Sequence, residues 1–192
     1  MNYSDFEDRK LLCRDCFVGK VYDCVVPSYG CKSNPKVVVM GEAPGADEVE
    51  NLQPFVGKAG KLLRATLNEF GFRQSNTLIT NVIPCRPEKN KFPKDLEIVR
   101  KCTKKWLYKE LEIVRPSFII LIGAKPLKFV LNRDGITKCR GEWYDFVLGD
   151  HTIKCMPTFH TSYVLRKKYM EDGDDIMAKF RRDVEEVAKV VL

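Results

Sequence analysis

The sequence predicts an α/β fold, a three-layer sandwich in which a central, mainly parallel four-stranded sheet is flanked by helices. Continuous apolar runs such as KVVVMG and SFIILIG are typical of strands that are covered on both faces. Segments with apolar residues at helical spacing alternate with these runs, as expected for a parallel sheet between two helical layers. The 192 residues, of which 44% are hydrophobic, suit a single domain over residues 1–192.

Each element has its own local signal. Gly71 stops a helix with one apolar stripe, Asp95 is a suitable cap for a long helix, and Pro116 prevents that helix from continuing. Gly149 and Asp150 indicate a hairpin turn. The stretch before residue 36 is expected to be irregular. The predicted strands are 36–41, 77–82, 117–123 and the hairpin pair 141–148 and 151–157, and the predicted helices are 57–70, 95–114, 124–131 and 175–191.

The charge and the apolar content limit the classes of function. Lys and Arg number 33 against 26 Asp and Glu, a net charge of +7, which is compatible with nucleic acid or with an ordinary solvated surface. No apolar segment approaches the ~20 residues that span a bilayer, and the polar start MNYSDFEDRK is not a secretory signal. We therefore expect no membrane association and a cytoplasmic, reducing compartment. The eight cysteines would there serve as ligands or buried thiols.

Polar side chains follow three of the predicted strands. Glu42 comes directly after the first, Asn81 lies at the end of the second, and His160 follows the last extended segment. Ligands bind at the carboxyl ends of the strands in such sheets, so we expect these side chains to share one cleft. Taken singly, Asn81 could cap a turn, His160 could be structural, and Phe55 in the loop after the first strand could belong to the core.

The motifs GEAPG, PFVGKAG, TNVIPCRP and HTSYVLR, in this order and with a Cys-x-x-Cys pair before them, resemble family 4 of the uracil-DNA glycosylase superfamily over about residues 13–166. The resemblance implies the uracil-DNA glycosylase-like fold. It also implies a monofunctional enzyme that flips uracil out of DNA and hydrolyses its N-glycosidic bond, leaving an abasic site for base excision repair. Thr161 stands where the family commonly has proline, and Val49 and Leu52 replace an acidic residue and a glycine.

The resemblance also implies roles for the cleft residues. Phe55 would stack on uracil, and Asn81 would read its O4 and N3 edge, which cytosine would mismatch. His160 would donate to O2, where the charge of the leaving base collects. Glu42 would orient the attacking water or support the sugar cation, or instead shape the pocket near uracil C5. The remaining substrate-binding residues would be Ala43, through its backbone N–H, and Ser162.

The residues after HTS are candidates for DNA contacts. An apolar wedge could come from Tyr163, Val164 or Leu165. Phosphates could be held by Arg166, Lys167 and Lys168, although a solvated basic turn is an equal alternative. The expected partner is DNA containing uracil, single- or double-stranded, bound by a monomer; a replication or repair protein partner is not identified by the sequence.

The resemblance makes Cys13, Cys16, Cys85 and Cys102 the ligands of a structural [4Fe–4S] cluster, which would tie residues 1–35 to the sheet. The rival interpretation is a tetrahedral zinc site. Its ligands would be Cys13, Cys16, Cys24 and Cys31. Cys139 and Cys155 are expected to be buried thiols.

Two other functions remain open. A superfamily member that traps the abasic sugar covalently on a histidine carries a His-bearing insert after the second strand, whereas the corresponding stretch here, PEKNKFPKD, has no histidine. A non-catalytic module that binds uracil-containing DNA is the alternative from a different class.

Overall fold

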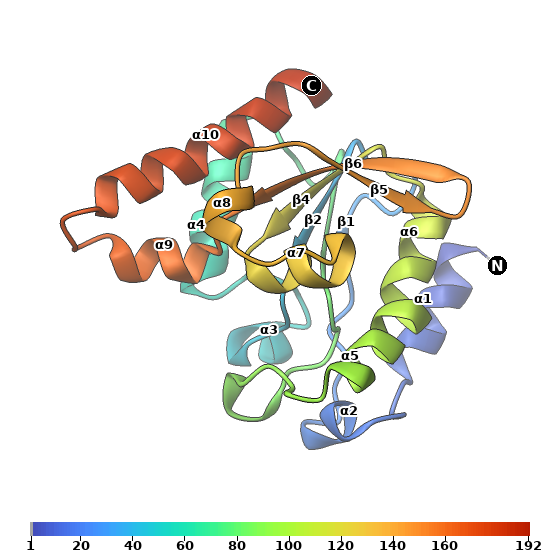
Figure 1. The fold of residues 1–192 in the computed structure, drawn as a ribbon. Coiled ribbons are helices and arrows are strands. Elements are labelled where there is room, and N and C mark those ends of the chain that lie inside the picture. Colours follow the sequence, from blue (N-terminus) through green and yellow to red (C-terminus); the bar gives the residue numbers. More distant parts are fainter. Residues whose placement is uncertain (1) are drawn as a thin grey trace.

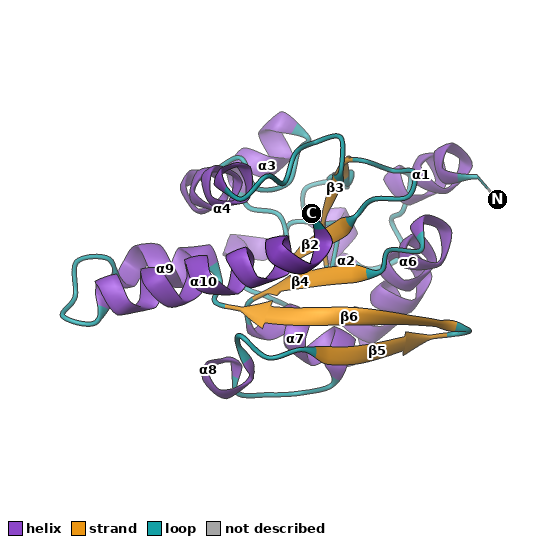
Figure 2. Cartoon of the chain, turned by 90° about the horizontal axis from the view of Figure 1, so that it is seen from above, coloured by secondary structure: helices purple, strands orange, loops and turns teal. Residues whose placement is uncertain are grey.

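The structure, a computed structural model that describes residues 2–192, is a six-stranded sheet between two layers of helices (Figures 1 and 2). The strand order is β1-β3-β2-β4-β6-β5. The inner strands are mutually parallel, and short antiparallel strands pair with both edges, which confirms the expected α/β sandwich and extends its sheet. The strands are β1 (Tyr29–Gly30), β2 (Val37–Gly41), β3 (Thr77–Asn81), β4 (Phe118–Ile122), β5 (Tyr144–Leu148) and β6 (His151–Thr158).

Alternate residues of the inner strands face opposite helical layers, as the period of two in a strand requires. Val38 and Met40 face the layer of α5 (Leu96–Cys102), α6 (Lys109–Val114) and α7 (Ala124–Leu131). Val37 and Val39 face the layer of α4 (Lys58–Glu69), α9 (Thr161–Lys167) and α10 (Gly173–Val191). All four side chains are fully buried, and each contributes about 1.5–3 kcal/mol of apolar transfer free energy.

The predicted long helix forms and is widened in its middle by a π-helical segment, η2 (Thr103–Tyr108), between α5 and α6. Asp95 caps it as expected, because its Oδ1 accepts hydrogen bonds from the N–H groups of Glu97 and Ile98. The hairpin prediction is also confirmed, with Leu148 paired to His151. Within residues 2–192, no helix is long and apolar enough to cross a membrane.

The amino-terminal stretch is more regular than predicted. It contains α1 (Tyr3–Leu11), α2 (Phe17–Val21) and β1, so the expectation of an irregular segment was wrong. The buried side of α1 consists of Phe6 and Lys10, and the buried lysine hides the apolar period in the sequence. The charge of Lys10 can be buried there because its Nζ lies 3.0 Å from Oε2 of Glu110, which is itself fully buried on α6.

Candidate functional site

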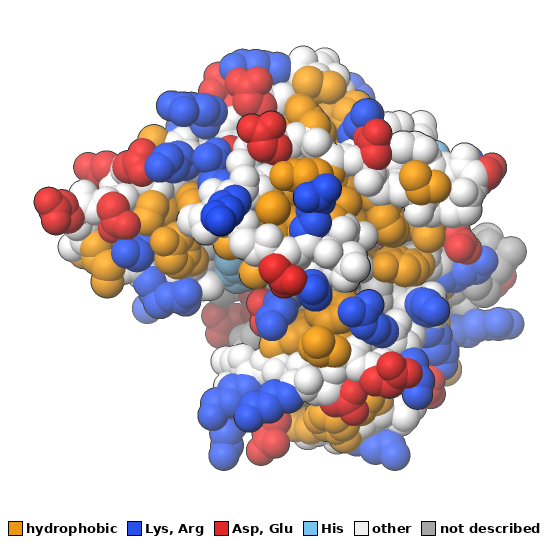
Figure 3. All heavy atoms as spheres, in the orientation of Figure 1, with side chains coloured by type: hydrophobic (Ala, Val, Ile, Leu, Met, Phe, Trp, Pro, Cys, Tyr) orange, Lys and Arg blue, Asp and Glu red, His pale blue; other side chains and the backbone are white. Residues whose placement is uncertain are grey.

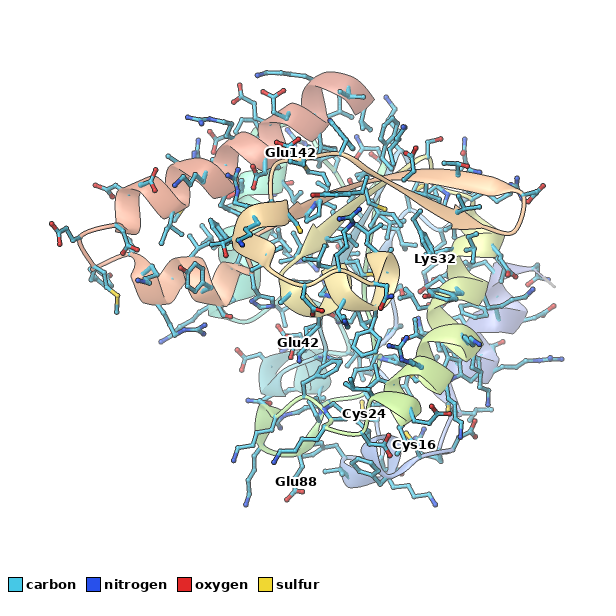
Figure 4. All side chains as sticks on the ribbon, in the orientation of Figure 1. Cys16, Cys24, Lys32, Glu42, Glu88 and Glu142 are labelled. Atoms are coloured by element: carbon cyan, nitrogen blue, oxygen red, sulfur yellow. The ribbon has the colours of Figure 1, made fainter. Side chains whose placement is uncertain are left out.

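A cleft of about 920 Å³ opens where the inner strands end. It lies between these strand ends, the short helices α3 (Ala46–Asn51) and α8 (Ile136–Cys139), and the start of α9. Figure 3 shows this face hollowed, with Lys and Arg side chains gathered below the hollow, and Figure 4 shows Glu42 between the strand ends and α3. Most of the predicted site residues line this one cleft: Glu42, Ala43, Phe55, Asn81, His160, Ser162, Tyr163 and Arg166.

Gly41 brings the phenyl ring and the amide of the site together. A Cβ on Gly41 would overlap the Phe55 ring and lie 2.5 Å from Oδ1 of Asn81. Both side chains therefore lie against the end of β2, and only glycine leaves room for them. Asn81 is 9% exposed, and within residues 2–192 its amide makes no hydrogen bond, so both of its polar atoms remain free to bind a ligand in the cleft.

The loop that carries Phe55 is held in an unusual conformation. Phe55 has a left-handed φ of 56°, a region that costs a non-glycine residue roughly 1–3 kcal/mol. Arg64 fixes it by donating from Nε to the Phe55 carbonyl at 2.8 Å and from Nη2 to the Pro54 carbonyl at 2.7 Å. A Cβ on Gly60 would overlap the Phe55 backbone, so α4 packs directly beneath it.

Glu48 of α3 holds the other side of the same loop. Its Oε1 accepts hydrogen bonds from the N–H groups of Val56 and Gly57, both at 2.9 Å, and its Oε2 accepts one from Gly45 at 2.9 Å. The helix then ends at Leu52 with a left-handed φ of 49°. A left-handed φ is unfavourable for a residue with a side chain, so the leucine strains the backbone there.

His160 is the N-cap of α9, and its hydrogen bonds define its tautomer. Nδ1 accepts the N–H of Ser162 at 3.1 Å and lies 2.7 Å from the Ser162 hydroxyl, which leaves the proton of a neutral ring on Nε2. Burial, followed by the charge of Arg166, lowers the pKa of His160 to about 4. The ring is therefore neutral at pH 7. It packs near Phe55, with a ring-centroid distance of 6.4 Å.

Glu42 supplies the carboxylate of the cleft. Its pKa is raised above the ordinary value because the side chain is partly buried, and the nearby charge of Lys125 opposes this shift. A partly desolvated carboxylate with no hydrogen-bond partner among residues 2–192 is suited to holding a water molecule.

Only some of the residues that were predicted to contact DNA lie at the cleft. Val164 is fully buried in the core, so its prediction as a wedge was wrong. Its buried position follows from the helical spacing of α9, which turns this residue toward α4 and α10. Tyr163 packs on Phe159 with ring centroids 5.3 Å apart. Leu165 and Lys167 do not line the cleft, and Lys167 forms an ion pair with Asp172 at 3.1 Å.

Thr161, for which the resemblance led us to expect proline, is fully buried at the first position of α9. Its hydroxyl oxygen makes no hydrogen bond within the described residues. Since an unpaired buried hydroxyl is costly, this side chain destabilises the protein locally, while the neighbouring His160 and Ser162 contact each other.

Four cysteines predicted as ligands gather at the carboxyl end of β3. The thiol pKa values of Cys85 and Cys102 rise to about 12, first because both are buried and then because each lies near the other predicted ligands, Cys13 and Cys16. The indole Nε1 of Trp106 donates to Sγ of Cys13 at 3.2 Å. As the side chains stand, no three His, Cys, Asp or Glu groups among residues 2–192 are arranged to hold a metal ion.

The rival zinc set does not come together. The backbone N–H of Cys31 donates to Thr77 at the amino end of β3. The other members of the set, Cys13, Cys16 and Cys24, lie near Cys85, which follows the carboxyl end of β3, and the length of the strand separates the two ends by about 13 Å. Cys16 and Cys24 lie near α2, as Figure 4 shows. Cys139 and Cys155 are buried thiols, as predicted.

Sequence reasoning missed Glu48 and Arg64, which shape the site from outside it. Glu48 is the third residue of α3 and accepts the N–H of the N-cap residue Gly45, which is the glutamate half of a capping box, and this spacing could have identified it. No local signal identifies Arg64, because its partners are backbone carbonyls ten and nine residues away.

Comparison with known proteins agrees with this geometry. The family model described as the uracil DNA glycosylase superfamily matches residues 27–185. The type-4 uracil-DNA glycosylase of Thermotoga maritima is 38% identical over 138 residues, 71% of this chain and 69% of that protein. The type-4 enzyme of Archaeoglobus fulgidus is 34% identical over 165 residues, 83% of this chain and 81% of that protein. The chain therefore belongs to the uracil-DNA glycosylase superfamily and, within it, to the type-4 family.

Proposed function

We propose that this protein is a monofunctional uracil-DNA glycosylase, which hydrolyses the N-glycosidic bond of uracil in DNA and leaves an abasic site. The observation that carries the proposal is the single cleft lined by Glu42, Phe55, Asn81 and His160. A base inside a duplex is unreachable, so the uracil is flipped into this cleft at a cost of a few kcal/mol.

The phenyl ring of Phe55 stacks on the flipped base, and the free amide of Asn81 reads its edge. The amide donates to uracil O4 and accepts from N3–H. Cytosine presents a donor and an acceptor in the reverse order, so the buried amide would be left unpaired against it. This mismatch gives the cleft its selectivity for uracil.

Bond cleavage leaves negative charge on the departing uracil, and His160 is prepared to bind it. Because Nδ1 accepts from Ser162, the neutral ring presents its Nε2–H as a fixed donor to uracil O2. A preorganised donor of this kind contributes about 2.7–4 kcal/mol. Glu42 orients the water that attacks the sugar and stabilises the cationic sugar through its carboxylate.

The substrate strand crosses the mouth of the cleft along α9. Arg166 lines the cleft and is exposed, so it is placed to bind a phosphate next to the flipped nucleotide. With Val164 buried and Tyr163 packed on Phe159, Leu165 is the remaining apolar wedge. Lys167, at the end of the helix, would contact a phosphate only by exchanging it for its ion pair with Asp172.

A [4Fe–4S] cluster bound by Cys13, Cys16, Cys85 and Cys102 fits the donor set, because four thiols and no competing imidazole gather there. Such a cluster serves as a structural staple between the amino-terminal segment and β3, since hydrolysis transfers no electron. Iron and sulfide analysis tests this assignment. The Cys102→Ser variant should lose iron. The Cys24→Ser variant, which changes a cysteine near Cys85 that is not a proposed ligand, should retain it.

The activity is tested by measuring uracil release from single- and double-stranded DNA. Asn81→Ala and His160→Ala should each lower the single-turnover rate by about 10²–10³, whereas His151→Ala, which alters the chain's other histidine, should not. DNA binding without any uracil release would favour the non-catalytic module. A covalent protein–DNA adduct would favour the trapping alternative.

A further inference from the structure

We propose that Glu48 is a positioning residue for the base-stacking ring of Phe55, an inference that rests on the proposed function. Glu48 does not contact the base. Its carboxylate instead bridges the start of α3 and the end of the loop that precedes α4, accepting from Gly45 at the first and from Val56 and Gly57 at the second. These three hydrogen bonds enclose Phe55, which is the residue immediately before Val56.

The need for such a bridge follows from the backbone of Phe55. Its left-handed φ of 56° is unfavourable for a residue with a side chain, so the loop would relax without external restraints. Arg64 restrains the carbonyl groups of Pro54 and Phe55, and Glu48 restrains the N–H groups that follow. Two opposite charges from α3 and α4 therefore hold the two sides of one strained peptide segment.

The glycines around the carboxylate are consistent with this role. A Cβ on Gly45 would lie 2.7 Å from Oε2 of Glu48, and a Cβ on Gly57 would lie 2.7 Å from Oδ2 of Asp47 and 3.5 Å from Oε1 of Glu48. Residues with side chains would push these carboxylates away from the loop. The Glu48 carboxylate also lies at the amino end of α4, where the helix dipole favours negative charge.

Holding the ring before the substrate arrives has a defined kinetic signature. The stacking contact with uracil exists both in the bound substrate and in the transition state, so its loss raises KM and leaves kcat largely unchanged. A loop that must be ordered on binding also weakens binding. Glu48→Gln keeps the size of the side chain but replaces one acceptor oxygen with a donor, which opposes the N–H groups it faces.

The test is steady-state uracil release by the full chain, together with inhibition by free uracil. Glu48→Gln should raise KM and the inhibition constant for uracil by roughly tenfold to hundredfold, with kcat within about threefold of the wild type. Arg64→Lys, which keeps the charge but cannot bridge two carbonyls, should show the same pattern. Glu50→Gln, an exposed change on the same helix, is the matched control and should leave both constants unchanged.

A double-mutant cycle with Phe55→Ala identifies the route of the effect. If Glu48 acts through the ring, adding Glu48→Gln to Phe55→Ala should change KM by less than about twofold. The inference would be contradicted if the increases in KM caused by Glu48→Gln and Phe55→Ala multiplied in the double variant. A fall in kcat alone, or a normal KM in both the Glu48 and Arg64 variants, would also contradict it. Absence of uracil release by the wild type would instead contradict the proposed function, so the two failures are distinguishable.

Discussion

The cleft and the cysteine-bearing segment before β2 are positioned by different kinds of interaction. In the cleft, glycines allow close approach, and charged side chains hold backbone groups, as Glu48 and Arg64 do around Phe55. The amino-terminal segment is joined to the rest by a buried ion pair, Lys10 with Glu110, and by thiols that do not reach a metal-binding arrangement on their own. The cleft is thus organised by hydrogen bonds and close packing, whereas the segment adds to its β1 pairing and apolar packing a buried pair of charges and its proposed cluster.

This difference has a physical consequence. Backbone hydrogen bonds and close packing restrain the cleft at many points, so a single change there should affect activity more than stability. Glu110 has a single countercharge, Lys10, so removing that lysine should affect stability more than activity.

The largest expected effect is on the buried ion pair. Lys10→Met removes the countercharge of Glu110, whose other partners are the Tyr3 hydroxyl at 2.5 Å and the Thr80 hydroxyl at 3.1 Å. We expect the free energy of unfolding to fall by about 3–5 kcal/mol in denaturant titrations, because a buried carboxylate is left without a cation. Arg9→Met, an exposed change on the same helix, is the control. Equal stability of the two variants would show that the pair does not hold α1.

The next effect is the acid sensitivity that His160 contributes. Its pKa in the folded protein is about 4, below the ordinary 6.5, so the unfolded chain binds the proton first as the pH falls. The contribution to stability is therefore lost between about pH 6.5 and pH 4 and amounts to at most about 3 kcal/mol. His160→Asn keeps an N-cap side chain without a titrating group, so its unfolding free energy should lack this loss. An identical pH dependence in both proteins would exclude the neutral, buried ring.

Gly41→Ala should affect activity with little change in stability. The added Cβ would displace the Phe55 ring and the Asn81 amide, and a displacement of about 1 Å can cost about 100-fold in rate. The measurement is kcat/KM on a uracil-containing oligonucleotide, with the midpoint of thermal unfolding recorded alongside. Gly19→Ala, whose Cβ would meet Cys13 and Cys85 no closer than 3.4 Å, is the matched change in the cysteine region. Full activity in Gly41→Ala would mean that the two side chains do not need this placement.

The smallest expected effect is a gain in stability at the edge of the cleft. Thr161→Pro removes a buried, unpaired hydroxyl at the first position of α9, where proline fits because its missing N–H has no helical partner. We expect unfolding to require about 1 kcal/mol more free energy, with activity maintained. Thr161→Val, measured in parallel, distinguishes the loss of the hydroxyl from the effect of the proline ring. A destabilised valine variant would show that the hydroxyl has a partner.

Much of the fold could be predicted because its elements carry local signals. The apolar runs of β2 and β4, the Asp95 cap and the turn at Gly149 each determine structure within a few residues. Helix α1 was missed because its buried position 10 is a lysine, which resembles a solvated surface until Glu110 is known to face it. Val164 was misjudged because an apolar residue after a motif gives no indication of which face of a helix it occupies.

For the candidate site, the sequence by itself determined the residue types and their places at the ends of strands: Glu42, Asn81 and His160. Parallel strands bring such positions to one edge whatever the rest of the chain does. Only the tertiary structure decided which nitrogen of His160 carries the proton and that the Phe55 ring packs against the Cα of Gly41. It also decided that Glu48 and Arg64 form hydrogen bonds with the backbone of the loop around Phe55. These depend on contacts between backbone groups and side chains of separate elements, and the free energy of such contacts is set by distances that no local pattern of residues encodes.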